Sequence, residues 1–112
     1  MTGRVTIPVR LISEANARGH WAAKARRATK GRQQGRLAVQ ILRAHNYPVA
    51  DARIVTLTRI APRRLDDDNL RGAFKFVRDG IADALGINDG ADAVKWMYDQ
   101  KPGMYAVEVV LA

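Results

Sequence analysis

The sequence of 112 residues contains no cysteine and only two histidines. The absence of cysteine excludes a disulfide framework and a thiolate metal site, and it fits a reducing compartment. Long apolar runs are also missing, since none reaches the roughly 18 residues that a membrane span needs. Residues 1–4 lead directly into an alternating segment without an apolar signal core. We therefore expect a cytoplasmic protein with no membrane partner.

The hydrophobic content and the length of the chain are typical of one ordered domain. Hydrophobic residues make up 47% of the chain, which argues against a disordered tail. Domains of about 100 to 150 residues are the commonest size, and a second core would have too little material. We therefore expect a single domain over residues 1–112.

Charge is divided unevenly along the chain, whose net charge is +8. Residues 1–65 hold 14 Lys/Arg and 2 Asp/Glu, a net charge of +12, whereas residues 66–112 hold 5 and 9, a net charge of −4. Metal-dependent cleavage of a phosphodiester needs such a division, with one part facing a polyanion and another gathering cations. A solvated basic surface is the alternative interpretation.

Hydropathy patterning predicts strands over residues 4–11, 53–60, 94–98 and 105–111. Pro8 indicates that the first strand lies at an edge, because proline cannot donate to a ladder. The last two strands are predicted to form a hairpin around the turn at 101–103.

Two helices are predicted between these strands. Residues 13–46 have helical spacing, with a break at Gly31 or Gly35 as the alternative to one helix. Residues 70–85 carry a regular apolar stripe, and Gly86 follows as a left-handed cap. The order β-α-β-α-β-β predicts an α+β fold with two helices packed on a four-stranded mixed sheet.

The cluster Asp66-Asp67-Asp68 carries the clearest chemistry. One aspartate is explained as a helix cap, worth about 0.3–1 kcal/mol through the helix dipole. Unit charges about 4 Å apart at an effective dielectric of about 20, however, repel by about 4 kcal/mol. Such crowding favours a hard cation, Mg²⁺ or alternatively Mn²⁺. In an extended segment Asp66 and Asp68 point the same way, so Asp67 faces elsewhere or caps the helix.

Polar residues of the second predicted helix are expected on the same face as the aspartate cluster. At about 100° per residue, Gly72, Lys75 and Asp79 share with Asp68 the face opposite the apolar stripe. Lys75 is thus expected to look toward the site, while an exposed ion pair with Lys75 is the favoured interpretation of Asp79. Asp89 would lie about 30 Å from Asp68 if it stayed in line with the helix. It joins the site only if its loop folds back or a second subunit supplies it, and an ordinary turn aspartate is the alternative.

Residues 63–70, Arg-Arg-Leu-Asp-Asp-Asp-Asn-Leu, resemble a motif of the RusA family of Holliday-junction resolvases, small endonucleases frequent in phages and prophages. The family motif is a basic run, then Asp-x-Asp-Asn-Leu, then a helix of the form Lys-x-x-x-Asp-x-Leu and an acidic loop. The resemblance covers residues 60–92 well. Residues 16–21, with Lys24 and Arg27, resemble the family's N-terminal basic stretch more loosely.

This resemblance implies a Mg²⁺-dependent endodeoxyribonuclease of the crossover-junction type, acting as a homodimer on branched DNA in recombination and repair. It implies that Asp66, Asp68 and Asp89 ligate the metal and that a helix lysine assists at the scissile phosphate.

The chain departs from the family motif at two places. Gly72 stands where the family lysine commonly lies, three residues after the Asn, so Lys75 takes that role only if three residues are inserted. Arg71 is the alternative if the helix is rotated. The late loop places one acid before Gly90, which leaves Asp92 as a competitor of Asp89 for the third ligand.

The basic half is predicted to hold phosphates, which position DNA without conveying its sequence. Trp21 is interpreted as core packing against Ala25 and Ala28, with stacking on an unpaired base as the alternative. The predicted DNA contacts are Arg18, Lys24, Arg26, Arg27, Lys30, Arg32, Arg36, Arg63 and Arg64.

Two other functions compete with this hypothesis. A non-catalytic DNA-binding phage protein could keep the fold and use the aspartates only for folding. A nuclease of the HNH type lacks its histidines here, and the acid-x-Lys signature occurs only at residues 99–101, next to a turn.

Overall fold

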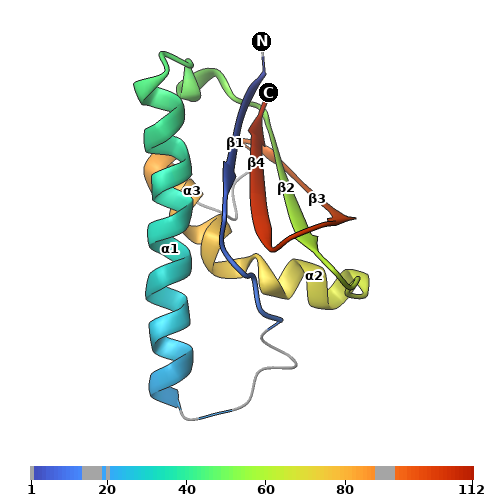
Figure 1. Ribbon diagram of the computed structural model, residues 1–112. Helices are drawn as coiled ribbons and strands as arrows, with labels where there is room; N and C mark the ends of the chain where they lie inside the picture. The colour runs from blue at the N-terminus through green and yellow to red at the C-terminus, as the bar shows by residue number, and fades with distance from the viewer. Residues whose placement is uncertain (1, 14–18, 20, 88–92) are drawn as a thin grey trace.

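The computed structural model describes residues 2–13, 19, 21–87 and 93–112. Three α-helices in these ranges lie on one side of a four-stranded sheet (Figure 1). The elements follow in the order β1 (Gly3–Ile7), α1 (Trp21–Ala44), η1 (Val49–Asp51), β2 (Ile54–Ala61), α2 (Asp67–Ala73), α3 (Lys75–Leu85), β3 (Lys95–Pro102) and β4 (Ala106–Leu111).

The sheet has the strand order β1-β4-β2-β3, with β2 and β3 parallel and β4 antiparallel to both β1 and β2. The predicted α+β fold with a mixed four-stranded sheet is therefore confirmed. The strand order also confirms that the first strand lies at an edge. Its predicted extent of residues 4–11 is wrong, because β1 ends at Ile7 and Pro8 follows the strand instead of lying within it.

The predicted hairpin between the last two strands is wrong, because β2 lies between β3 and β4. β4 fills a central position, where Val107, Val109 and Leu111 are almost completely buried. Its connection to β3 crosses the end of β2 at Gly103, whose φ is 157° and whose N–H donates to the Ala61 carbonyl at 3.2 Å. A residue with a Cβ would be strained in that conformation.

The alternative of a break at Gly31 or Gly35 is also wrong, since α1 runs through both. α3 packs against α1 there at backbone distance. A Cβ on Gly35 would lie 2.8 Å from the Ile81 backbone nitrogen and nearer still to the Val77 carbonyl oxygen, and a Cβ on Gly31 would lie 2.6 Å from Phe76 Cβ. The close approach of the helices thus outweighs the poor helix propensity of glycine.

The count of two helices is wrong because the helix predicted over residues 70–85 is two helices. α2 already begins at Asp67 and ends at Ala73, and α3 follows after Phe74. Phe74 has φ −88° and ψ −2° and is fully buried, with its ring centroid 6.1 Å from that of Tyr98. Packing of this ring against β3 accompanies the break. The predicted left-handed cap at Gly86 is confirmed by its φ of 72°.

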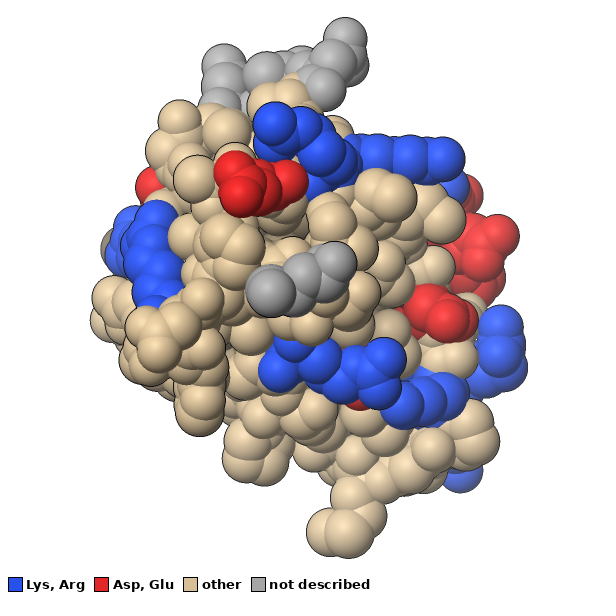
Figure 2. All heavy atoms as spheres, turned by 90° about the horizontal axis from the view of Figure 1, so that it is seen from above, with Lys and Arg blue, Asp and Glu red and all other residues tan. Residues whose placement is uncertain are grey.

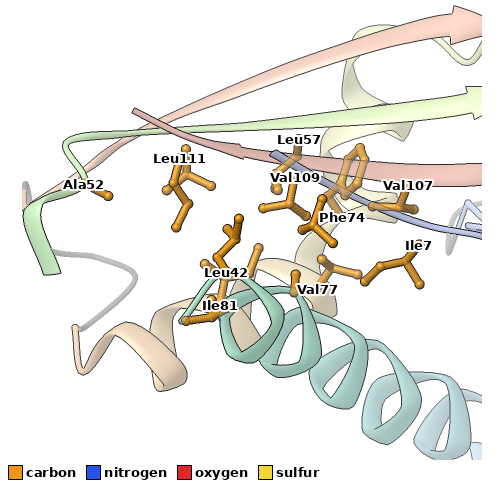
Figure 3. Close-up of a cluster of buried hydrophobic side chains, with 14 of the residues drawn as sticks. Ile7, Leu42, Ala52, Leu57, Phe74, Val77, Ile81, Val107, Val109 and Leu111 are labelled. Atoms are coloured by element: carbon orange, nitrogen blue, oxygen red, sulfur yellow. The ribbon is translucent and has the colours of Figure 1, made fainter. Parts of the chain in front are cut away.

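The core lies between the sheet and the helices (Figure 3). Alternate residues of β2, among them Val55 and Leu57, face the helices and are buried. Trp21 is not part of this core, because 75% of its surface is exposed at the start of α1. Its interpretation as core packing is therefore wrong.

Candidate functional site

Asp66 caps α2. Its Oδ1 accepts a hydrogen bond from the Asn69 backbone N–H at 2.9 Å, and its Oδ2 accepts one from Asn69 Nδ2 at 3.2 Å. The helix begins at Asp67, so the extended segment that was expected to align Asp66 with Asp68 ends one residue too early. The cap is thus Asp66 and not Asp67. All three carboxylates are exposed to solvent.

The residue before this cap is held to the sheet at two points. The Leu65 N–H donates to Gln100 Oε1 at 3.0 Å, and Gln100 Nε2 donates to the Leu65 carbonyl at 2.7 Å. Gln100 is buried on β3, and its own N–H donates to Asp99 Oδ1 at 2.8 Å. The amide of Gln100 therefore sets where α2 and its carboxylates begin relative to the sheet.

Arg59 fastens the same loop from β2. Its Nη1 donates to the Arg63 carbonyl at 2.6 Å, and its Nε donates to the Leu11 carbonyl at 3.5 Å. Burial lowers the pKa of the Arg59 guanidinium, while nearby Tyr105 raises it and Arg10 lowers it. An arginine stays charged even so, and its hydrogen bonds offset part of the cost of burying that charge.

Sequence reasoning missed both of these supporting residues. Arg59 occupies the strand face of Val55 and Leu57, where alternation leads one to expect an apolar residue. A cation in such a position is the signal that could have found it. Gln100 lies beside Arg59 in the register of β2 and β3, and nothing in its local sequence marks it.

The described residues contain no group of three His, Cys, Asp or Glu side chains that could hold a metal ion. Asp66 and Asp68 are two residues apart in the sequence, at the N-cap and in the first turn of α2, and Asp89 and Asp92 lie outside the described residues. The flanks of that segment, Ile87 and Ala93, line a cavity of about 120 Å³ near the start of β2.

Asp66 follows the other end of β2. An eight-residue strand separates its two ends by about 23 Å, at about 3.3 Å per residue. The described flanks of Asp89 and the start of α2 are thus at opposite ends of the strand.

Lys75 does not share a continuous helix with Asp68, because Phe74 separates α2 from α3. The helix-face argument that turned Lys75 toward the cluster therefore does not hold. Lys75 Nζ lies 3.6 Å from Asp79 Oδ2, which confirms the ion pair. Lys75 is exposed, whereas Asp79 is half-buried. Arg71, the alternative cation, is exposed on α2 with its guanidinium 5.7 Å from the centroid of the Tyr98 ring.

The predicted DNA contacts fall into four groups. Arg18 lies outside the described residues, and two residues are half-buried, Arg27 and Arg32, the latter with its guanidinium 5.9 Å from the Phe76 ring centroid. Arg36 is exposed but pairs with Asp83 of α3 at 3.1 Å. The other exposed residues are Lys24, Arg26, Lys30, Arg63 and Arg64.

On at least one face of the molecule, the basic side chains do not form a continuous patch. Figure 2 shows the end that carries both termini, where Lys and Arg side chains form separate groups with Asp and Glu side chains between them. The division of charge along the chain is therefore less sharp on this face of the fold.

No helix within the described ranges combines the length and apolar character needed to cross a membrane. No known family model matches the chain. The chain is similar to an uncharacterized protein of Xylella fastidiosa, with 39% identity over 80 residues, which are 66% of this chain and 51% of that protein. The chain thus spans about half the length of this relative.

Proposed function

We propose that the protein is a Mg²⁺-dependent, structure-selective endodeoxyribonuclease that cuts Holliday junctions or related branched DNA as a homodimer. One observation carries this proposal: exposed Asp66 and Asp68 lie at the start of α2, and Leu65, which is hydrogen-bonded to Gln100, separates them from exposed Arg63 and Arg64. Carboxylates that can hold a cation and arginines that can hold a phosphate are thus a few residues apart on one support.

The donor set fits Mg²⁺. This ion usually keeps several waters and binds through one or two carboxylates together with substrate phosphates. Asp66 and Asp68 would hold it, with Asp89 as the predicted third ligand and Asp92 as its competitor. When bound, the ion would supply charge neutralisation and a water of lowered pKa.

The remaining roles belong to the cations of the chain. Arg63 and Arg64 would bind the phosphates next to the cut, and the exposed cations of α1 would bind those farther along. Lys75 remains the predicted lysine at the scissile phosphate, with Arg71 as the alternative. Arg71 is on α2 itself and therefore lies on the same element as the carboxylates.

A homodimer is consistent with the arrangement around β2. The described flanks of Asp89 lie near the start of this strand, whereas Asp66 follows its end. Asp89 from a second subunit would complete a site to which the described residues of one chain contribute Asp66 and Asp68. Two such sites in a symmetric dimer would cut two strands across a junction.

Cleavage of a synthetic four-way junction tests the proposal. The wild-type protein with Mg²⁺ should convert the junction into nicked duplexes, and Asp68→Asn should still bind but not cut. Asp51→Asn is the matched control, because Asp51 is also exposed but lies in η1. Asp68→Asn with wild-type activity would overturn the assignment.

A non-catalytic DNA-binding phage protein that keeps the fold is the second candidate, and Gly72 favours it. The position of the family lysine is empty of side chain here, and a Cβ on Gly72 would meet nothing within 4 Å. This candidate predicts that junction binding survives EDTA and that calorimetry detects no Mg²⁺ or Mn²⁺ binding that Asp68→Asn abolishes. The open space also permits Gly72→Lys, which should increase cutting if a lysine assists there.

A further inference from the structure

A hollow of about 410 Å³ lies between residues 8–12, the N-terminal half of α1 and the junction of α2 with α3. Two of the predicted DNA contacts, Arg27 and Lys30, line it, but the acidic cluster and its supporting residues do not. Its volume is within the range of about 300–1,000 Å³ that small-molecule sites occupy.

The inner wall of the hollow is apolar. Leu11, Ala73 and Val77 are buried there, and Phe76 adds a half-buried aromatic side chain. Gly31 borders the hollow without a side chain, because its Cβ would collide with Phe76. A flat apolar group that entered would leave water and could stack on an aromatic neighbour.

The rim is cationic. Arg27 and Lys30 are three residues apart on α1 and thus neighbours on its surface. Arg10 lines another part of the rim, with its guanidinium 4.7 Å from the Tyr105 ring centroid. Gln34 adds an amide that can both donate and accept. No acidic residue is among the described residues that line the hollow.

We propose that this hollow binds one unpaired nucleotide of a DNA strand, with its base against the apolar wall and its phosphate at Arg27 and Lys30. An acyl chain or apolar peptide would account for the wall but not for the three cations that the described part of the rim contributes. A simple anion would account for the cations but not for the wall. A nucleotide joins both chemistries, because every base has an apolar face and every linkage has a charge.

The position of the hollow relates it to the acidic cluster. Ala73 lines the hollow at the end of α2, and Asp67 begins the same helix seven residues long, about 10 Å away at about 1.5 Å per residue. A strand held in the hollow could thus reach the carboxylates. The choice of DNA as the source of the nucleotide rests on the proposed function, whereas binding of a nucleotide does not require cutting.

Two labelled pentanucleotides of equal charge test the proposal in EDTA, which prevents cleavage. One carries five thymines, and the other is abasic throughout. The wild-type protein should bind the thymine strand about tenfold more tightly, which is within the range that stacking of one base contributes. Ala73→Met, which adds an aliphatic chain to the wall, should abolish this preference.

Charge variants provide the matched comparison. Lys30→Gln should weaken binding of both strands more than Lys24→Gln does, since Lys30 lines the hollow and Lys24 does not. On titration of the wild-type protein with the thymine strand, the amide NMR signals of Gly31 and Val77 should shift, a measurement that does not depend on the folding of any variant.

Equal affinity of the wild-type protein for the two strands would overturn the proposal, as would unchanged Gly31 and Val77 signals at saturation. A protein that cuts junctions but shows no preference for bases would keep the proposed function and lose this site. A protein that never cuts but prefers bases, with that preference lost in Ala73→Met, would keep this site alone.

Discussion

Asp66 is both a helix cap and a candidate metal ligand, and two substitutions separate these roles. Asp66→Ala removes the acceptor of the Asn69 N–H, which costs about 1 kcal/mol, within about 0.5–2 kcal/mol. Asp66→Asn keeps an acceptor oxygen, and asparagine caps helices about as well as aspartate. We therefore expect Asp66→Asn to retain stability and Asp66→Ala to lose it.

The loss is large enough to measure by calorimetry. With an unfolding entropy of about 2.1 cal/mol/K per residue, a chain of 112 residues has a total of about 0.24 kcal/mol/K. Loss of about 1 kcal/mol should then lower the Tm of Asp66→Ala by about 4 °C. The Tm of Asp66→Asn should stay within about 1 °C of the wild-type value.

The rise in Tm that Mg²⁺ causes tests whether Asp66 is a metal ligand. At a concentration about 100 times its Kd, a ligand that binds only the folded state adds about 2.7 kcal/mol, which corresponds to a rise in Tm of about 11 °C. The wild-type protein should show such a rise, and both Asp66 variants should lose it. Asp67→Asn is the control, because Asp67 is the neighbouring carboxylate without a predicted metal role.

Two outcomes would refute this reasoning. An undiminished Mg²⁺ shift in Asp66→Asn would show that the Asp66 carboxylate is not a ligand. A Tm of Asp66→Ala equal to that of the wild-type protein would show that the two hydrogen bonds to Asn69 do not stabilise the fold.

Three further predictions concern the support and the basic surface. Gly35→Ala should destabilise the protein by about 1–3 kcal/mol through overpacking, whereas Gly72→Ala should stabilise it by up to about 1 kcal/mol. Equal denaturation midpoints of the two variants would contradict the close contact between α1 and α3. Gln100→Ala leaves both Leu65 backbone groups unpaired, so it should cost about 1–3 kcal/mol and reduce junction cutting more than junction binding; unchanged cutting would exclude a positioning role. Junction affinity should fall with salt, with log K linear in log salt and a slope of about −0.9 for each phosphate neutralised, and a flat response would argue against DNA as the partner.

The elements with strong local signals were predictable from the sequence. The alternation of Val107, Val109 and Leu111 predicted β4 and its buried face, and the apolar stripe with Gly86 predicted where α3 ends. The sequence also singled out Asp66 and Asp68 as candidate cation ligands, because three consecutive aspartates are evident in the sequence itself.

Tertiary packing decided the features that local rules could not. The position of β4 between β1 and β2 depends on pairing with strands far away in sequence, so a turn before it did not imply a hairpin. Gly31 and Gly35 carry the unfavourable propensity of glycine, yet α1 continues because α3 occupies the space that their side chains would take. Local patterns determine which face of an element is buried, whereas only the packed structure determines what it is buried against, because that contact joins residues distant in the chain.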